Sequence, residues 1–211
     1  AFGLSGQKCS ALSRLYVENS VADKLADMLR EKIAALKVGD PTVLQNWMGP
    51  VTTSNALSNF ESYAKRLREE GGRILAGGER ITEGELSNGF FVAPTLAEAP
   101  AGHSLFREEM FLPIVMMCRV ANREEAMQLA NDSPLGLTAG VYGNDEDIAY
   151  FFDNIEAGVC YANRPQGATT GAWPGYQPFG GWKGSGSTGK AIASFYYLQQ
   201  YLREQSQTTV E

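Results

Sequence analysis

Histidine and cysteine are scarce in this sequence of 211 residues, which limits the chemistry that it can support. The three cysteines, Cys9, Cys118 and Cys160, lie far apart and form no CxxC pair, so neither a disulfide framework nor a zinc site is favoured. The single histidine, His103, excludes a metal cluster built on histidines and argues against a Cys or Ser triad with a histidine base. We expect a reducing compartment, and a catalytic thiol in this chain would need activation by another group.

Long apolar runs and an excess of positive charge are also absent. No apolar stretch approaches the roughly 20 residues that span a bilayer, and the N-terminus has no basic segment followed by an apolar one. The formal net charge is -6 with both signs interspersed, so neither nucleic acid nor an anionic membrane is expected as a partner. Hydrophobic residues make up 44% of the chain, enough for a continuous core. These features predict a globular cytoplasmic protein with no nucleic acid and no membrane among its partners.

Hydrophobic periodicity predicts strands and helices as far as residue 163, and the two kinds of element alternate from residue 113 onward. Apolar residues at spacings of three and four predict helices at 20–36, 54–72, 122–132 and 145–155. Short apolar segments predict strands at 12–17, 74–81, 90–96, 113–120, 137–143 and 158–163. The run at 113–120 is apolar almost throughout, which is typical of a strand covered on both faces. Crossovers of this kind predict parallel pairing, so we expect an α/β domain with a mostly parallel sheet flanked by helices.

The rest of the chain lacks this regularity. Residues 163–190 are dense in glycine and proline, and an irregular segment longer than about 15 residues in a compact domain is usually functional or disordered. Its aromatic residues argue against disorder. Residues 196–211 partly alternate polar and apolar residues, which predicts a terminal strand that leaves the domain. No linker separates two independent cores, so residues 1–195 are expected to form one domain.

Cys9 lies in the segment GQKCSA, residues 6–11, where small and polar neighbours leave room for a planar carbonyl to approach the sulfur. A lone cysteine is more often an inert core residue than a nucleophile, so this context needs support from other motifs. Three further blocks follow in order: REEMFLPIV at 107–115, NDSPLGLTAGVYG at 131–143 and QPFGGWKGSG at 177–186. In order and spacing, the four blocks resemble the aldehyde dehydrogenase superfamily, from residue 1 to the C-terminus.

The resemblance implies a role for several of these residues. In that family a cysteine thiolate attacks the aldehyde, hydride passes to NAD or NADP, and water hydrolyses the resulting thioester; Cys9 matches this nucleophile. Glu109 matches the acidic residue that hydrogen-bonds the nicotinamide ribose, and Phe111 matches the aromatic ring that supports the nicotinamide. Leu112 and Pro113 stand where Gly-Pro is commonest in the family, which leaves cofactor choice open.

The loop TTGAWPGYQPFGG, residues 169–181, resembles that of the 1-pyrroline-5-carboxylate dehydrogenases within the superfamily. By that resemblance Gly171, Ala172 and Ser10 would hold the α-carboxylate of L-glutamate γ-semialdehyde, and Phe179 would pack against its methylenes. Backbone amides in a glycine-rich loop can form an anion-binding nest, which suits a carboxylate.

Two alternatives to this substrate and activity stay open. Trp173 makes the loop bulkier and could fit the pocket to another semialdehyde or to an aliphatic aldehyde. In a protein of a different class, a non-catalytic interaction domain, Cys9 would be vestigial.

The resemblance also implies parts of the enzyme that this sequence does not contain. The superfamily has a cofactor-binding domain, a general-base glutamate and an oxyanion-hole asparagine upstream of the nucleophile, whereas eight residues precede Cys9 here. We therefore expect 1–195 to be a catalytic domain lacking its N-terminal part and inactive alone, whether a truncated piece, a split subunit or a reused interaction domain. Residues 196–211 resemble the family's oligomerisation strand, which implies a homo-oligomer for the intact enzyme.

Overall fold

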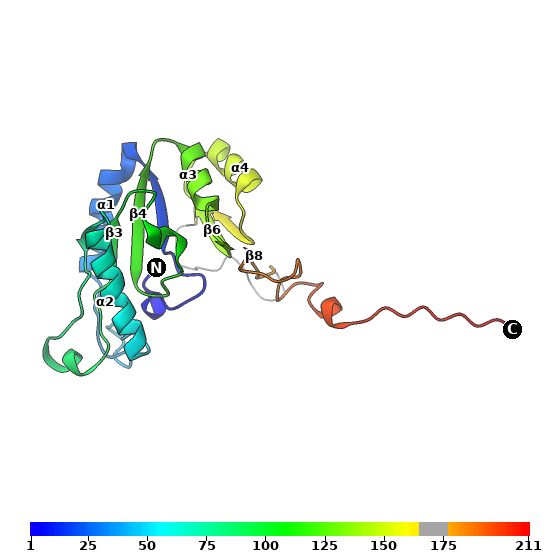
Figure 1. Ribbon diagram of the computed structural model, residues 1–211, viewed down its shortest axis with the longest axis horizontal. Helices are drawn as coiled ribbons and strands as arrows, with labels where there is room; N and C mark the ends of the chain where they lie inside the picture. The colour runs from blue at the N-terminus through cyan, green and yellow to red at the C-terminus, as the bar shows by residue number, and fades with distance from the viewer. Residues whose placement is uncertain (165–176) are drawn as a thin grey trace. The chain divides into compact units, whose positions relative to one another are not determined.

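The computed structural model describes residues 1–164 and 177–211. The chain forms two compact units, residues 1–133 and residues 134–211, and each is described by itself. Figure 1 shows the elements of both units, coloured from blue at the N-terminus to red at the C-terminus. The division between the two units falls between residues 133 and 134. The expected single domain 1–195 stays a prediction.

A four-stranded mixed sheet is the framework of residues 1–133, with the strand order β1-β4-β3-β2. Strands β1 and β3 both run parallel to β4, while β2 pairs antiparallel with β3 at the edge. The strands are β1 Arg14–Glu18, β2 Arg73–Ala76, β3 Thr95–Glu98 and β4 Ile114–Val120. The expected mostly parallel sheet is confirmed, with one antiparallel edge strand.

Three α-helices pack against this sheet (Figure 1), and they are α1 Asn19–Ala34, α2 Ser54–Glu69 and α3 Arg123–Asn131. Side-chain caps explain where two of them begin. Thr53 accepts a hydrogen bond from the Ala56 amide before α2, and Asn122 accepts one from the Glu125 amide before α3. The helices expected in this unit are confirmed to within a few residues at their ends. Short 3-10 turns form at Gly3–Gly6, Gly84–Asn88 and Ser104–Arg107.

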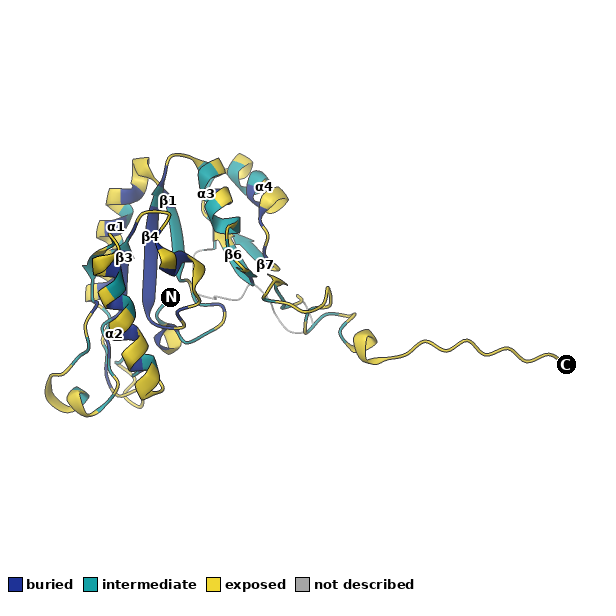
Figure 2. Ribbon diagram, viewed as in Figure 1, coloured by how far each residue is buried: buried dark blue, intermediate teal, exposed yellow. Residues whose placement is uncertain are grey.

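Strand β4 is covered on both faces, as its apolar run predicts. Met116 lies in one core cluster with Phe60 of α2, and Val115 and Met117 lie in a second cluster with Ala22 of α1. Figure 2 shows β4 as buried and the outer sides of α1 and α2 as largely exposed. The segment that enters β4 is therefore attached to a strand that is buried between two core clusters.

Residues 134–211 contain a parallel strand pair, β6 and β7, joined by the helix α4, and a short antiparallel pair, β5 and β8. A capping box begins α4, because Asn144 and Asp147 each accept a hydrogen bond from the other's amide. The expected strand, helix and strand between residues 137 and 163 are confirmed. The elements are β5 Leu135–Gly136, β6 Thr138–Val141, α4 Asp145–Asn154, β7 Val159–Ala162 and β8 Trp182–Lys183.

Three expected strands differ in the structure. Of the strand expected at 90–96, Thr95 and Leu96 begin β3 and Val92 forms only an isolated bridge with Arg80, because Pro94 between them has no amide hydrogen to donate to a ladder. The strand expected at 74–81 ends at Ala76, because Gly77 and Gly78 adopt left-handed backbone conformations that leave the ladder. At the C-terminus, Leu198–Tyr201 form a 3-10 turn, and residues 202–211 form no strand in the single chain. A strand requires a hydrogen-bonded neighbour, so the role of 196–211 in oligomerisation stays a prediction.

Candidate active site

Cys9 lies on an exposed turn near the N-terminus. The amide of Ala11 donates a hydrogen bond to the carbonyl of Lys8 at 3.0 Å, which places Cys9 and Ser10 at the central positions of the turn. The turn exposes Cys9 and buries Ser10, of which 3% is exposed. A nucleophile must be reachable by its substrate, so the turn suits the role predicted for Cys9. The contact of Ser10 with substrate stays a prediction.

Two hydrogen-bonded anchors fix the segment before Cys9. The buried Ser5 hydroxyl donates to the carbonyl of Gly49 at 2.9 Å. The side-chain oxygen of Gln7 accepts from the amide and from the hydroxyl of Thr52, both at 3.0 Å. The Cys9 turn is therefore held by polar groups on both sides of Gly6.

Gly6 brings the cysteine segment against the segment that enters β4. Its φ is +68°, in the left-handed region, and a Cβ atom there would lie 2.3 Å from the carbonyl oxygen of Leu112 and 2.8 Å from the nitrogen of Pro113. Only glycine permits both this backbone conformation and this close approach. The first motif block therefore packs directly on the second, although the two are far apart in the sequence.

The segment from Glu109 to Leu112 alternates between solvent and core. Glu109 and Phe111 are exposed, whereas Met110 and Leu112 are each 5% exposed. Phe111 has a φ of +54°, a conformation that is rare for a bulky residue and that is often retained at functional sites. The two side chains predicted to contact the cofactor are therefore both accessible, next to the backbone that Gly6 contacts.

The other two cysteines are less suited to nucleophilic attack. Burial raises the pKa of the Cys118 thiol, and the charges of Glu125 and Glu98 raise it further. Burial also raises the pKa of the half-buried Cys160 thiol. Because the thiolate is the reactive form, the exposed Cys9 is the thiol best placed to react.

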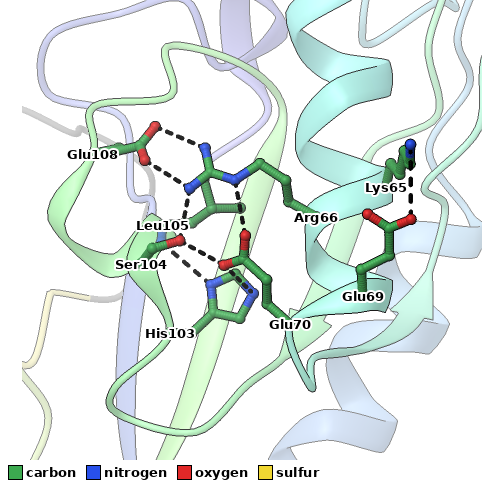
Figure 3. A network of polar contacts seen from close by, with 8 residues as sticks. All are labelled: Lys65, Arg66, Glu69, Glu70, His103, Ser104, Leu105 and Glu108. Carbon is green, nitrogen blue, oxygen red and sulfur yellow. Dashed lines mark hydrogen bonds and ion pairs between the residues drawn. The ribbon is translucent and has the colours of Figure 1, made fainter.

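A network of charged and polar side chains that no motif predicts includes Glu108, the residue before Glu109 (Figure 3). Arg66 donates two hydrogen bonds to Glu108, at 2.8 and 3.2 Å, one to Glu70 at 3.2 Å and one to Ser104 at 2.6 Å. The spacing of Arg66 and Glu70 predicts a pair on one helix face. Their contact with Ser104 and Glu108 carries no local sequence signal, because it joins α2 to a distant turn.

In residues 134–211, the third and fourth motif blocks pair with each other. The amide of Gly136 in β5 donates to the hydroxyl of Ser185 at 3.1 Å, and the amide of Gly184 donates to the carbonyl of Pro134 at 2.9 Å. Lys183 of β8 forms an ion pair with Glu156. These contacts support a structural role for both blocks.

The residues predicted to bind the substrate are only partly described. Phe179 is half-buried, and its amide donates to the carbonyl of Ile192 at 2.9 Å. Gly171, Ala172 and Trp173 lie outside the described residues. Their roles, like that of Phe179, stay predictions.

Comparison with known proteins agrees with the motif blocks. The model of the aldehyde dehydrogenase family matches residues 1–206. The chain belongs to the aldehyde dehydrogenase family. Curated relatives include the 1-pyrroline-5-carboxylate dehydrogenases of Bacillus thuringiensis (strain Al Hakam) and Bacillus cereus (strain AH187), each 40% identical over 213 residues. The alignment covers 100% of this chain and 39% of each of these aldehyde dehydrogenases, so the chain spans well under half of their length.

Solved aldehyde dehydrogenase structures share the fold. A 1-pyrroline-5-carboxylate dehydrogenase from Thermus with bound NAD is 35% identical, with a TM-score of 0.86 over 96% of this chain and 38% of that one. Betaine aldehyde dehydrogenase from Staphylococcus aureus in complex with NAD+ is 30% identical, with a TM-score of 0.85 over 94% of this chain and 38% of that one. A variant of the latter enzyme carries NAD+ and a BME-modified cysteine. The mixed sheet flanked by helices is thus that of an aldehyde dehydrogenase domain.

Within residues 1–164 and 177–211, no group of three or more His, Cys, Asp or Glu side chains is arranged to hold a metal ion. Over the same ranges, no helix is both long and apolar enough to cross a membrane.

Proposed function

We propose that this chain carries the nucleophile and a cofactor-contacting segment of an NAD(P)-dependent aldehyde dehydrogenase that oxidises L-glutamate γ-semialdehyde to L-glutamate, a step of proline catabolism. The observation that carries the proposal is the packing of Gly6 on Leu112, which joins the Cys9 turn to the segment with Glu109 and Phe111. The 40% identity to 1-pyrroline-5-carboxylate dehydrogenases supports the choice of substrate.

Glu109 and Phe111 fit a nicotinamide nucleotide. An exposed carboxylate can accept hydrogen bonds from both ribose hydroxyls, and an exposed phenyl face can pack on a flat nicotinamide ring. The NAD in the Thermus and S. aureus relatives favours NAD over NADP for this chain. When bound, the nucleotide supplies the hydride acceptor.

Cys9 supplies the covalent chemistry in this proposal. Its sulfur attacks the aldehyde carbon, a C–S bond forms, and the carbonyl electron pair moves to the oxygen. Departure of hydride from that carbon converts the thiohemiacetal to a thioester. Water then adds to the thioester carbonyl, the C–S bond breaks, and the product carboxylic acid and the Cys9 thiol separate. The general base and an oxyanion donor would come from other parts of the polypeptide.

Substrate selection would come from the carboxylate-binding loop. We propose that Gly171 and Ala172 donate backbone amides to the α-carboxylate, with Ser10 as a further contact and Phe179 against the methylenes. Such a site favours aldehydes that carry a carboxylate at the matching distance, because unpaired amides disfavour an apolar substrate.

Two partners complete the proposal. A cofactor-binding domain elsewhere in the polypeptide would hold most of the nucleotide, as expected for a chain that covers 39% of its relatives. Residues 196–211, of which 202–211 are exposed and form neither helix nor strand in the single chain, would pair with a neighbouring subunit of a homo-oligomer.

The test is NADH or NADPH formation by the longest continuous polypeptide that contains this sequence. Glutamate γ-semialdehyde, succinic semialdehyde and a simple aliphatic aldehyde would be compared with both NAD and NADP. We expect a strong preference for glutamate γ-semialdehyde. The activity with this substrate should be lost in Cys9→Ala and kept in the matched control Cys160→Ala.

Other outcomes separate the parts of the proposal. Preference for another aldehyde would overturn the roles of Ser10, Gly171 and Ala172 and leave that of Cys9 standing. Activity that survives Cys9→Ala would refute the nucleophile itself. Absence of activity with every aldehyde would favour an interaction domain with a vestigial Cys9.

A further inference from the structure

The side chain of Arg66 joins helix α2 to the residue that precedes Glu109. Its guanidinium group donates a hydrogen bond to each carboxylate oxygen of Glu108, at 2.8 and 3.2 Å (Figure 3). Paired hydrogen bonds of this kind fix the orientation as well as the position of the carboxylate. The backbone of Glu109 therefore begins at a point that is fixed relative to α2.

The turn before Glu108 is attached to the same helix. Ser104 accepts a hydrogen bond from Arg66 and donates one to Glu70, both at 2.6 Å. The buried His103 closes the start of this turn, because its Nδ1 accepts a hydrogen bond from the Leu105 amide at 3.2 Å. Residues 103–108 thus form a closed turn that Arg66 and Glu70 hold against the end of α2.

The far end of the cofactor segment is anchored independently. The Gly6 contact confines the backbone of Leu112, and Pro113 leads directly into the buried strand β4. Between the two anchors lie Glu109, Met110 and Phe111, with Phe111 in a left-handed conformation. A short segment with a rare backbone conformation keeps it only when both of its ends are held.

We propose that Arg66 is a positioning residue for the segment Glu109–Phe111, holding it in the geometry that binds the nicotinamide nucleotide. This inference rests on the proposed function, because it assigns Arg66 an effect on the cofactor that Glu109 and Phe111 would contact. It also goes beyond that function, since Arg66 lies on α2 and outside all four motif blocks.

The surroundings of Arg66 suit an arginine in this role. Its side chain is 29% exposed and its guanidinium carbon lies 5.8 Å from the ring centre of Tyr63, so part of the group is shielded from water. The hydrogen bonds to Glu108 raise the pKa of Arg66, and the group stays charged. A lysine at this position would keep the charge. Its single ammonium group could not form the paired hydrogen bonds to Glu108 and, at the same time, the hydrogen bonds to Glu70 and Ser104.

The experiment compares Arg66→Gln, Arg66→Lys and Arg68→Gln in the longest continuous polypeptide that contains this sequence. Arg68 is the matched control, because it is an arginine of the same helix that donates to the carbonyls of Ala64 and Gly78, away from the turn at 103–108. The measurements are the KM for NAD, the KM for the aldehyde and the melting temperature of each variant.

We expect Arg66→Gln to raise the KM for NAD about tenfold, because binding must then order a loosened segment. The KM for the aldehyde should change less than about twofold, and Arg66→Lys should recover part of the affinity for NAD. Arg68→Gln should leave both KM values unchanged. Equal effects of Arg66→Gln and Arg68→Gln, or an unchanged KM for NAD in a folded Arg66→Gln, would overturn the proposal.

Two further measurements keep the test decisive. If Arg66→Gln does not fold, Glu108→Gln removes the paired contact while leaving Arg66, Glu70 and Ser104 in place, and it should show the same selective rise in the KM for NAD. If the parent polypeptide forms no NADH at all, the proposed function fails, and hydrogen exchange then tests the positioning separately. Faster exchange of amides 108–111 in Arg66→Gln but not in Arg68→Gln would support it, and equal exchange would refute it.

Discussion

Gly6→Ala should destabilise the protein and slow its chemistry together. An alanine at this position would have to keep the left-handed φ of +68°, which costs about 1–2 kcal/mol for a residue other than glycine. It would also lie 2.3 Å from the Leu112 carbonyl oxygen, a backbone atom that cannot rotate away, and overpacking of this kind typically costs about 1–3 kcal/mol. The sum is a loss of about 2–5 kcal/mol in the free energy of unfolding, a large part of the stability of an ordinary domain.

Two other glycines serve as controls for the separate contributions. Gly3→Ala adds a Cβ in open space at an ordinary φ and should be nearly neutral. Gly71→Ala has a φ of +88° with nothing within 4 Å, so it should show the backbone cost alone. Urea unfolding of the longest polypeptide measures all three, and the rate of NADH formation should fall only for Gly6→Ala. A Gly6→Ala variant no less stable than Gly71→Ala would refute the tight contact with Leu112.

Three further predictions follow from burial and charge. Iodoacetamide should alkylate Cys9 faster than the two other thiols, whose pKa is raised by burial, and mass spectrometry of the intact protein would reveal equal labelling if this reasoning fails. The hydrogen bond from Arg119 holds the pKa of Glu98 below its usual value of 4.5. The ionised Glu98 therefore stabilises the folded protein at pH values above 4.5, and this contribution to the free energy of unfolding is lost as the pH falls through the lowered pKa. Arg119→Gln should therefore flatten the fall of unfolding free energy in acid, and an unchanged acid titration would contradict this. Phe60→Ala should cost about 3–5 kcal/mol in urea unfolding, because the ring is fully buried, and a loss below about 1 kcal/mol would show that the site collapses around the cavity.

The sequence predicts the helices and strands of the fold where the hydrophobic periodicity and the helix-capping residues indicate the same element. The apolar run at 113–120 predicts a doubly covered strand, and β4 is one because alternate side chains enter opposite clusters. Asn122 predicts the start of α3, since an asparagine side chain can accept from an amide that the first helical turn leaves unpaired. Both signals are local, so no knowledge of the tertiary structure was needed.

The features that the sequence does not predict depend on contacts between residues that are far apart in the chain. Motifs predict roles for Cys9 and Glu109, but the contact of Gly6 with Leu112, which links their two segments, has no local signature in the sequence. The sequence gives no signal for the role of Arg66, because a charged residue on an amphipathic helix normally faces solvent and its partner Glu108 lies far away in the sequence. The expected terminal strand failed in the single chain for the same physical reason, because strand formation depends on a neighbour.

The position of β4 between β1 and β3 also governs the order in which this unit can fold during synthesis. Arg14 of β1 pairs in register with Met116 of β4, so β1 lacks this neighbour until the chain has grown by about a hundred residues. At about 5–20 residues per second, that interval lasts on the order of 5–20 s. During it the apolar face of α1, and later that of α2, lacks the strand that covers it, so apolar surface stays exposed on the nascent chain over this stretch of translation.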